Sequence, residues 1–273
     1  MKSANSYRKH LYIIMMILSI IPIFFSITSI ALWIKDTYKI NQLSKKLKEY
    51  RYDDVINNNQ SILVNPPMNN LNDSYWDYID TPFLNIDFTD LKRENNDTVA
   101  WIQVMGTNVD YPVVQTTDNR FYLLHTFDKS FNKAGWIFSD YRNNFKTLNF
   151  NSIIYGHGLL NDTMFGSLNK TLTDDWFQNK KNHIIKLTTL DSNMIFQIFS
   201  VYTIQKESYY ITTYFQNSEK YLSFLKTIQK RSIFPFQTSL NTNDRILTLS
   251  TCKDDYGKRI VIHAKLIKRE TKV

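Results

Sequence analysis

Residues 246–255 read ILTLSTCKDD, and this stretch decides how the rest of the chain is interpreted. The apolar run at its start is typical of a buried strand, whereas the charged residues at its end require water. Cys252 lies at the change between the two and is the only cysteine among 273 residues. A lone thiol where a strand meets solvent is either a buried small hydrophobe or a nucleophile, and position alone leaves both interpretations open.

A histidine in residues 152–168, SIIYGHGLLNDTMFGSL, favours the nucleophile. The whole chain has six glycines, and three of them surround this histidine, His157. Glycine permits sharp backbone turns and the close approach of other groups. A Cys–His pair supplies a nucleophile and an acid–base partner, provided that the fold brings Cys252 and His157 together.

An arginine begins the next strand-like run, RIVIHAKL at residues 259–266. A loop of this length between two adjacent strands can place Arg259 beside Cys252. A guanidinium is always charged and can donate to a developing oxyanion, although a plain surface arginine is the simpler alternative. His263 lies on the same face of this strand, because side chains alternate with period two. It is the competing histidine, and we expect it to be structural.

The region around these residues alternates short apolar runs with polar turns. The strand-like runs are residues 99–104, 135–138, 152–155, 183–187, 194–205, 245–250 and 259–267. One amphipathic helix is expected at residues 218–232, with Ser218 as its cap. Short helical turns are expected at residues 75–79, 164–168 and 174–177. The pattern predicts a mostly β domain of seven or eight strands with a few peripheral helices.

The composition excludes several classes of protein. Hydrophobic residues make up 43% and charged residues 21%, which excludes a wholly disordered chain. A single cysteine excludes an intramolecular disulfide framework and a Cys-rich zinc site. Residues 254–255 are only a pair of aspartates, so neither a metal site nor a cofactor is expected. The formal net charge of +8 suits an anionic surface such as a membrane, and equally suits mere solubility.

Residues 11–34 form a run of 24 residues without a charged side chain. At about 1.5 Å per residue, a helix of this length covers a hydrocarbon core of about 30 Å. The apolar core of a secretory signal is shorter, about 7–15 residues, so the run indicates a retained membrane anchor. Cleavage near residues 29–31 is the alternative.

The orientation of this anchor is not fixed by charge. A plain count of basic residues places the C-terminal side in the cytoplasm, but long domains translocate largely regardless of charge. Residues 35–60 read as a helix whose basic side chains face lipid head groups or water, and residues 57–73 read as an Asn- and Pro-rich connection. The expected division is a short tail at 1–10, a transmembrane anchor at 11–34, a helical juxtamembrane segment and linker at 35–84, and a folded domain at 85–273.

The chain resembles the sortases, most closely those of class B. TLSTC at residues 248–252, followed by Arg259, is similar to the family's signature around the nucleophile, and YGH at residues 155–157 is similar to its histidine motif. Residues 88–127 and the stretch AGWIFSDYRN at residues 134–143 also look like class B. The resemblance covers residues 85–268.

This resemblance implies a closed sortase-type β-barrel of about eight strands with peripheral helices, preceded by an N-terminal helical segment and one transmembrane helix. It implies a cysteine transpeptidase of a Gram-positive bacterium, with a cytoplasmic N-terminus and an extracellular catalytic domain. Cys252 would attack a threonine carbonyl and form a thioester, and His157 would transfer protons. Arg259 would hold the carbonyl or oxyanion, together with the backbone N–H of Lys253. The implied substrate pocket comprises Asn119, Leu123, Tyr210, Ile211 and Ser250.

The resemblance also implies the partners. The donors are surface proteins with a C-terminal NPxTN-like or LPxTG-like sorting motif, and the acceptor is an amine of a peptidoglycan precursor or of a pilin lysine. No nucleic acid is expected. Wall anchoring is the first interpretation; a pilin-polymerising sortase, a cysteine peptidase that only hydrolyses and a non-catalytic binding protein with the same barrel are the alternatives. The sequence does not choose between the sorting motifs.

Overall fold

The computed structural model describes residues 2–52, 61–205, 207–251 and 257–272, so Cys252 and Lys253 lie outside the described residues. The chain divides into two compact units, Met1–Gln42 and Leu43–Val273. The first unit consists of helix α1 (Lys2–Leu47), whose last residues begin the second unit. Among the described helices, this one alone is long and apolar enough to cross a membrane, with a mean hydropathy of 2.5 and no burial in its most apolar window.

In its described residues, the second unit contains short helices and eleven strands. Its helical segments are η1 (Lys48–Tyr50), η2 (Ser74–Tyr78), α2 (Phe88–Glu94), η3 (Phe121–Leu123), η4 (Gly166–Leu172), α3 (Asp174–Gln178), η5 (Lys180–Asn182), η6 (Tyr209–Ile211) and α4 (Ser218–Lys230). Its strands are β1 (Arg51–Tyr52), β2 (Ser61–Leu63), β3 (Asn85–Ile86), β4 (Thr98–Val104), β5 (Asp110–Val114), β6 (Phe138–Ser139), β7 (Asn151–Gly156), β8 (Ile184–Thr189), β9 (Ser192–Ile204), β10 (Ile246–Thr251) and β11 (Arg259–Thr271).

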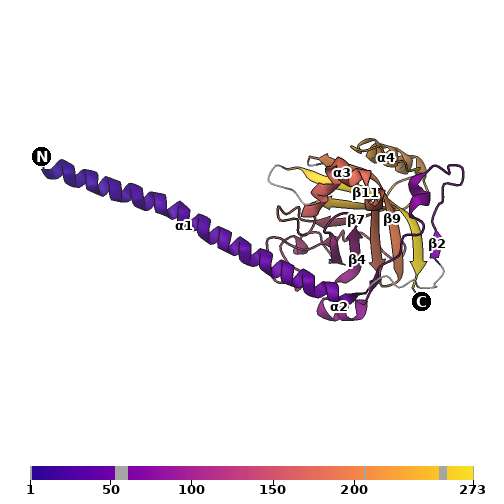
Figure 1. Cartoon of the computed structure of the whole chain (residues 1–273), viewed down its shortest axis with the longest axis horizontal. Helices are drawn as coiled ribbons and strands as arrows, with labels where there is room; N and C mark the ends of the chain where they lie inside the picture. The colour runs from indigo at the N-terminus through magenta and orange to yellow at the C-terminus, as the bar shows by residue number, and fades with distance from the viewer. Residues whose placement is uncertain (1, 53–60, 206, 252–256, 273) are drawn as a thin grey trace. The chain divides into compact units, whose positions relative to one another are not determined.

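Eight of these strands form a closed barrel. Their order is β10-β7-β6-β5-β4-β8-β9-β11, and the pairing of β10 with β11 closes the ring. The pairs β7–β10 and β5–β6 are parallel and the other barrel pairs are antiparallel. Strand β2 adds to the outer end of β11, beside the chain's C-terminus (Figure 1). This architecture confirms the predicted closed barrel of about eight strands with peripheral helices.

Helix α4 covers one flank of the barrel, as Figure 1 shows. Its apolar stripe, Tyr221, Phe224, Leu225 and Ile228, packs on Phe199 of β9 and Ile246 of β10. The predicted helix is therefore confirmed, but its predicted cap is wrong. The Asn217 side chain accepts the N–H of Lys220 at 2.9 Å, because Asn217 has extended dihedrals while Ser218 is already helical.

Three other expectations need correction. Residues 135–138 do not form a strand throughout, because Gly135 has φ +59° in a turn and β6 begins only at Phe138. Strand β5 was not predicted, since Pro112 interrupts its apolar run. It is tolerated there because β6 pairs with β5 only at Val114. The helix expected over residues 35–60 ends at Tyr50, where β1 begins and pairs with β3.

Candidate active site

The two sequence motifs end side by side in the barrel. Strands β7 and β10 are parallel and in register along their whole length, from Asn151 opposite Ile246 to Gly156 opposite Thr251. His157 is the next residue after Gly156, and Cys252 is the next residue after Thr251. The fold therefore places the end of the histidine motif's strand beside Thr251, which is the last described residue before Cys252.

The ring of His157 is oriented by a backbone carbonyl. Its Nε2 lies 2.9 Å from the carbonyl oxygen of Leu123, at the end of η3. A carbonyl can only accept, so Nε2 carries a proton and Nδ1 is the nitrogen left to exchange one. The loop after His157 turns back tightly, and a Cβ at Gly166 would overlap the carbonyl oxygen of Leu159. This close packing explains part of the glycine concentration around the histidine.

Arg259 lies at the first position of β11, next to the end of β10. The N–H of Ile260 donates to the Thr251 hydroxyl at 2.8 Å, which ties the start of β11 to the residue before Cys252. One guanidinium nitrogen of Arg259 donates to the Tyr210 hydroxyl at 3.1 Å. Its Nε is buried and has no hydrogen-bond partner among the described residues.

Two of the expected pocket residues belong to the same group. The hydroxyls of Tyr210 and Ser250 are 2.9 Å apart, and both side chains are buried. Tyr210 therefore joins Arg259 to Ser250. Ile211 follows Tyr210 in η6 and packs against the cluster that contains it, whereas the printed hydrogen bonds of Asn119 go to other residues. The Asn119 amide donates to Asp140 at 3.0 Å, and the Ile211 carbonyl accepts from Arg142 at 3.2 Å.

Asp140 and Arg142 were not predicted as site residues. They lie within the stretch AGWIFSDYRN, where an acidic and a basic residue two positions apart directly after a strand were the available signal. Burial alone would raise the pKa of the Asp140 carboxyl, but hydrogen bonds from Arg142 and Tyr155 outweigh it and the net pKa is lowered. The carboxylate is therefore charged at neutral pH.

His263 is structural, as expected. Burial lowers its pKa to about 3, so the ring is neutral. The Thr248 hydroxyl donates to the Asn151 side-chain oxygen at 2.6 Å and lies 2.8 Å from Nδ1 of His263. Because that hydroxyl has one proton, Nδ1 donates to it, and Nε2 accepts from the Tyr202 hydroxyl at 2.9 Å.

The buried hydrogen bonds of Thr248 and His263 continue through Asn151 to η6. The amide group of Asn151 donates to the carbonyls of Tyr210 and Thr212, each at 3.0 Å. The segment that carries two of the expected pocket residues is thus held by the barrel strand β7. Within the described ranges, no three His, Cys, Asp or Glu side chains converge in a way that could hold a metal ion.

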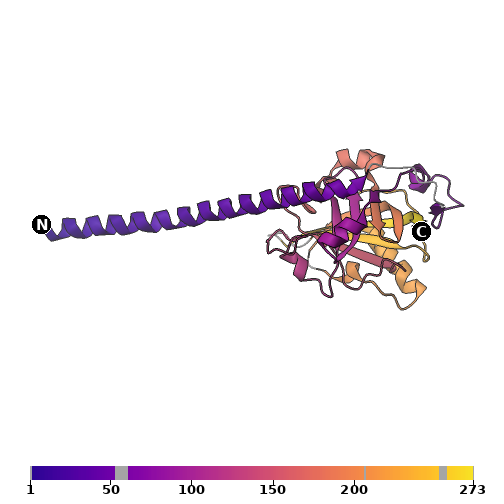
Figure 2. The ribbon, with the colours of Figure 1, turned by 90° about the horizontal axis from the view of Figure 1, so that it is seen from below.

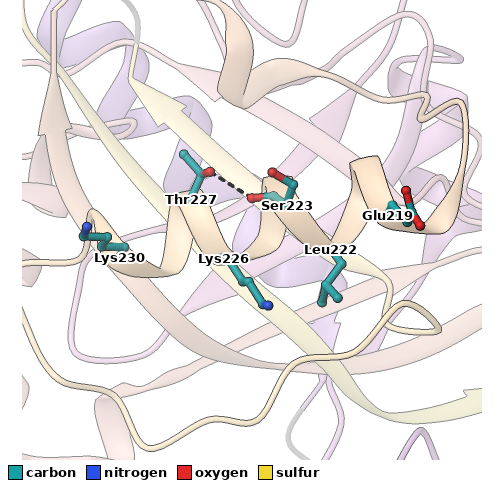
Figure 3. A pocket seen from close by; sticks show the side chains of 6 residues that line it. All are labelled: Glu219, Leu222, Ser223, Lys226, Thr227 and Lys230. Carbon is teal, nitrogen blue, oxygen red and sulfur yellow. Dashed lines mark hydrogen bonds between the residues drawn. The ribbon is translucent and has the colours of Figure 1, made fainter.

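A separate hollow of about 410 Å³ lies along the outer face of α4 (Figure 3). Its lining residues all come from that helix: Glu219, Leu222, Ser223, Lys226, Thr227 and Lys230. The Thr227 hydroxyl in it already donates to the Ser223 carbonyl at 2.8 Å. None of the expected catalytic or pocket residues lines this hollow, so the candidate site is elsewhere, where β7, β10 and β11 meet.

Comparison with known proteins supports the resemblance to the sortases that the sequence motifs suggest. A family model described as a sortase domain matches residues 102–267, more than half of the chain. The sortase B of Staphylococcus aureus is 38% identical over 184 residues, which cover 66% of this chain and 75% of that protein. A crystal structure of Bacillus anthracis sortase B in complex with AAEK1 has a TM-score of 0.69 at 31% identity, and covers 86% of this chain and 99% of that chain.

A solved complex of Staphylococcus aureus sortase B with substrate has a TM-score of 0.62 at 38% identity, and covers 66% of this chain and 84% of that chain. The family model spans most of the barrel and the described residues of the candidate site. The chain therefore belongs to the sortase family and, within it, to the class B sortases, which are cysteine transpeptidases that anchor proteins to the cell wall.

Proposed function

We propose that this chain cleaves a C-terminal sorting motif after threonine, with Cys252 as the nucleophile, His157 as the acid–base residue and Arg259 as the oxyanion donor. The observation that carries the proposal is the parallel pairing of Gly156 with Thr251, since each is the residue before one of the two motifs' reactive side chains. The bond from Ile260 to Thr251 adds the start of β11, and with it Arg259, to the same place.

The first half of the reaction forms a thioester. The Cys252 thiolate, whose proton has passed to His157, attacks the threonine carbonyl carbon, and the carbonyl electrons move to the oxygen. Donors of Arg259, with the backbone N–H of Lys253, stabilise this oxyanion. When the oxyanion collapses, the C–N bond breaks, and protonated His157 gives the leaving amine a proton from Nδ1, the nitrogen that Leu123 does not hold.

The second half transfers the acyl group. An incoming amine attacks the thioester carbonyl and gives a proton to His157. The C–S bond then breaks, which restores the thiolate and leaves a new amide. We assign the amine to a peptidoglycan precursor, with a pilin lysine as the alternative acceptor. Asn119, Leu123, Tyr210, Ile211 and Ser250 would line the groove for the sorting motif, and the substrate complex of the Staphylococcus aureus relative supports a peptide site in this family.

The apolar helix supports a membrane location. We propose that residues 11–34 anchor the chain by a single pass, with the tail at 1–10 in the cytoplasm. Residues 35–84 would then form the juxtamembrane segment and linker, and residues 85–273 the extracellular catalytic domain. The length and hydropathy of α1 support the anchor.

The test uses the full chain in detergent micelles. The protein is incubated with peptides carrying an NPxTN-like or an LPxTG-like motif, with and without triglycine as the amine, and its intact mass is measured. We expect a peptide adduct on the wild type that triglycine converts to an amide product, and none on Cys252→Ala. Arg259→Ala should slow the reaction about 100-fold or more, whereas Arg93→Ala, an exposed arginine paired with Asp90 on α2, is the matched control that leaves it unchanged.

Two results would count against the proposal. Cleavage of the peptide without any amide product would indicate a peptidase that only hydrolyses. Absence of both adduct and cleavage with either motif would remove the proposed activity.

A further inference from the structure

The carboxylate of Asp140 is the centre of a hydrogen-bonded cluster beside the candidate site. Its side chain is fully buried. It accepts from the Asn119 amide at 3.0 Å and from the Tyr155 hydroxyl at 2.9 Å. It also accepts from Arg142 three times, from the backbone N–H at 2.9 Å, from Nε at 2.8 Å and from a terminal nitrogen at 2.7 Å.

These contacts join three segments that are distant in the sequence. Asn119 precedes η3, whose last carbonyl orients the ring of His157. Tyr155 belongs to β7, two positions before His157. Arg142 extends the cluster to a third segment, because the same nitrogen that binds Asp140 donates to the Ile211 carbonyl of η6 at 3.2 Å. One buried carboxylate thereby connects both proposed walls of the peptide groove.

The pair formed by Asp140 and Arg142 can hold two segments at a fixed distance. A guanidinium and a carboxylate meet through two parallel hydrogen bonds, which set angle as well as distance. A lysine would supply the charge without the fork, and an asparagine would supply neither the charge nor a second acceptor oxygen. Asn119 is also held on its other side, since its oxygen accepts the N–H of Tyr141 at 3.0 Å. The loop of Asn119 therefore has little freedom to shift while Asp140 is in place.

We propose that Asp140 and Arg142 are positioning residues that set the distance between the loop of residues 119–124 and η6, and so fix the width of the groove for the sorting peptide. This inference rests on the proposed function of that groove. We assign neither residue a contact with the reacting atoms. Their effect is on how the peptide is held, and it reaches His157 only through η3 and Tyr155.

Loss of the carboxylate should weaken peptide binding more than chemistry. In Asp140→Asn the fork is lost, Arg142 turns toward water, and the Ile211 carbonyl loses its donor. We expect KM for the sorting peptide to rise about tenfold, with kcat within about threefold of the wild type. Arg142→Lys should act in the same direction, and Tyr155→Phe, which removes a single bond, should raise KM about threefold.

The matched control is Asp244→Asn. Asp244 is another fully buried aspartate with a cationic partner, Lys265 at 3.4 Å. It precedes β10, at the opposite end of that strand from Thr251. This variant should lose at least as much stability as Asp140→Asn but keep the wild-type KM below its melting temperature. A rise in KM caused by general loosening of the fold would appear in both variants.

Hydrogen–deuterium exchange supplies a readout that does not depend on turnover. The full chain in micelles is compared with the three site variants and the control by mass spectrometry. Backbone amides in residues 116–124 and 208–214 should exchange about tenfold faster in Asp140→Asn and Arg142→Lys, with α4 and β9 unchanged. Unchanged exchange in both segments, or an unchanged KM, would overturn the proposal, as would an equal increase throughout the barrel.

The design separates this proposal from the proposed function. Alkylation by iodoacetamide reports the sole cysteine of the chain, and its rate should stay within about twofold in every variant. If the wild type transfers no peptide, the proposed function fails while the exchange experiment still decides whether Asp140 joins the two segments. If Asp140→Asn does not fold, Arg142→Lys and Tyr155→Phe carry the same test.

Discussion

Asp140 and Asp244 are both fully buried beside a cation, yet their pKa values shift in opposite directions. For Asp140, the hydrogen bonds outweigh burial and the pKa is lowered. For Asp244, burial dominates over Lys265 and the backbone N–H of Asn241, and the pKa is raised. Asp140 has the stronger donors, and burial weighs more heavily on Asp244.

The geometry of the two cations explains this contrast. Arg142 binds Asp140 through a two-pronged contact at 2.7 and 2.8 Å, and its side chain remains 37% exposed to water. Lys265 contacts Asp244 through its single ammonium nitrogen at 3.4 Å, and its side chain is only 1% exposed. Near the candidate site the carboxylate is well satisfied and its cation is hydrated. At the other end of β10 both charges lie in the interior, where desolvation is costly.

The largest expected effect is on the interior pair. Asp244→Asn leaves Lys265 buried without its counter-charge, so we expect the free energy of unfolding to fall by about 3–5 kcal/mol. Urea unfolding in micelles, followed by tryptophan fluorescence, measures this. A loss below about 1 kcal/mol would show that the Ser239 carbonyl, which accepts from Lys265 at 3.0 Å, suffices as a partner.

A smaller loss of stability is expected at the site. Asp140→Asn removes charge-assisted hydrogen bonds, but Arg142 can move into water, so the free energy of unfolding should fall by about 2 kcal/mol. The same urea experiment measures it. A loss larger than that of Asp244→Asn would contradict the comparison, because it would show that hydration of the arginine gives no relief.

The third prediction concerns how the stability of the barrel depends on pH. Besides the two aspartates, the barrel buries His263. The folded pKa of His263 is about 3, below the usual value of about 6.5. Between these values the unfolded chain binds a proton that the folded chain does not, so stability falls as pH falls, by about 1.4 kcal/mol per pH unit. In His263→Gln the slope should be smaller by about this amount between pH 6 and pH 4, while His183, whose pKa burial also lowers, keeps its own contribution. Parallel curves for variant and wild type would refute the assignment.

The smallest effect should come from replacing the whole interior pair. A double variant, Asp244→Leu with Lys265→Met, removes both charges together and keeps similar volume. Such replacements are often neutral, so the free energy of unfolding should stay within about 1 kcal/mol of the wild type. Thermal unfolding measures it, with Asp244→Asn alone as the reference. If the double variant is as unstable as the single one, the pair provides more than mutual neutralisation.

The barrel was predictable because its strands carry local signals. Six of the seven predicted strand-like runs overlap most of an observed strand. An apolar run bounded by turns can be recognised from a few neighbouring residues. Strand β5 was missed, because Pro112 argues against a strand unless the short β6 is known. The cap of α4 was displaced by one residue, because Asn217 and Ser218 are both good caps by type.

The candidate site was only partly predictable. His157 and Arg259 could be singled out from their glycine-rich and strand-end surroundings, and the neighbouring residues Gly156 and Ile260 lie beside Thr251. The catalytic roles of His157 and Arg259 stay predictions. The hydrogen bonds of Asp140 could not be predicted, because they join residues 119, 140, 142 and 155, and through Arg142 residue 211. No local pattern encodes a contact between such distant positions. The roles of Cys252 and Lys253 stay predictions, because both lie outside the described residues.

Strand β11 pairs with β9, β10 and β2, and in both views it runs to the C-terminal edge of the domain (Figure 1 and Figure 2). It is also the last barrel strand to be synthesised. Until it emerges from the ribosome, β9 and β10 keep unpaired edges, which are templates for pairing with other chains. Biogenesis must therefore keep the nascent chain from associating until nearly all of the barrel has been made. Closure is then a late, long-range event, and long-range strand pairing is intrinsically slow.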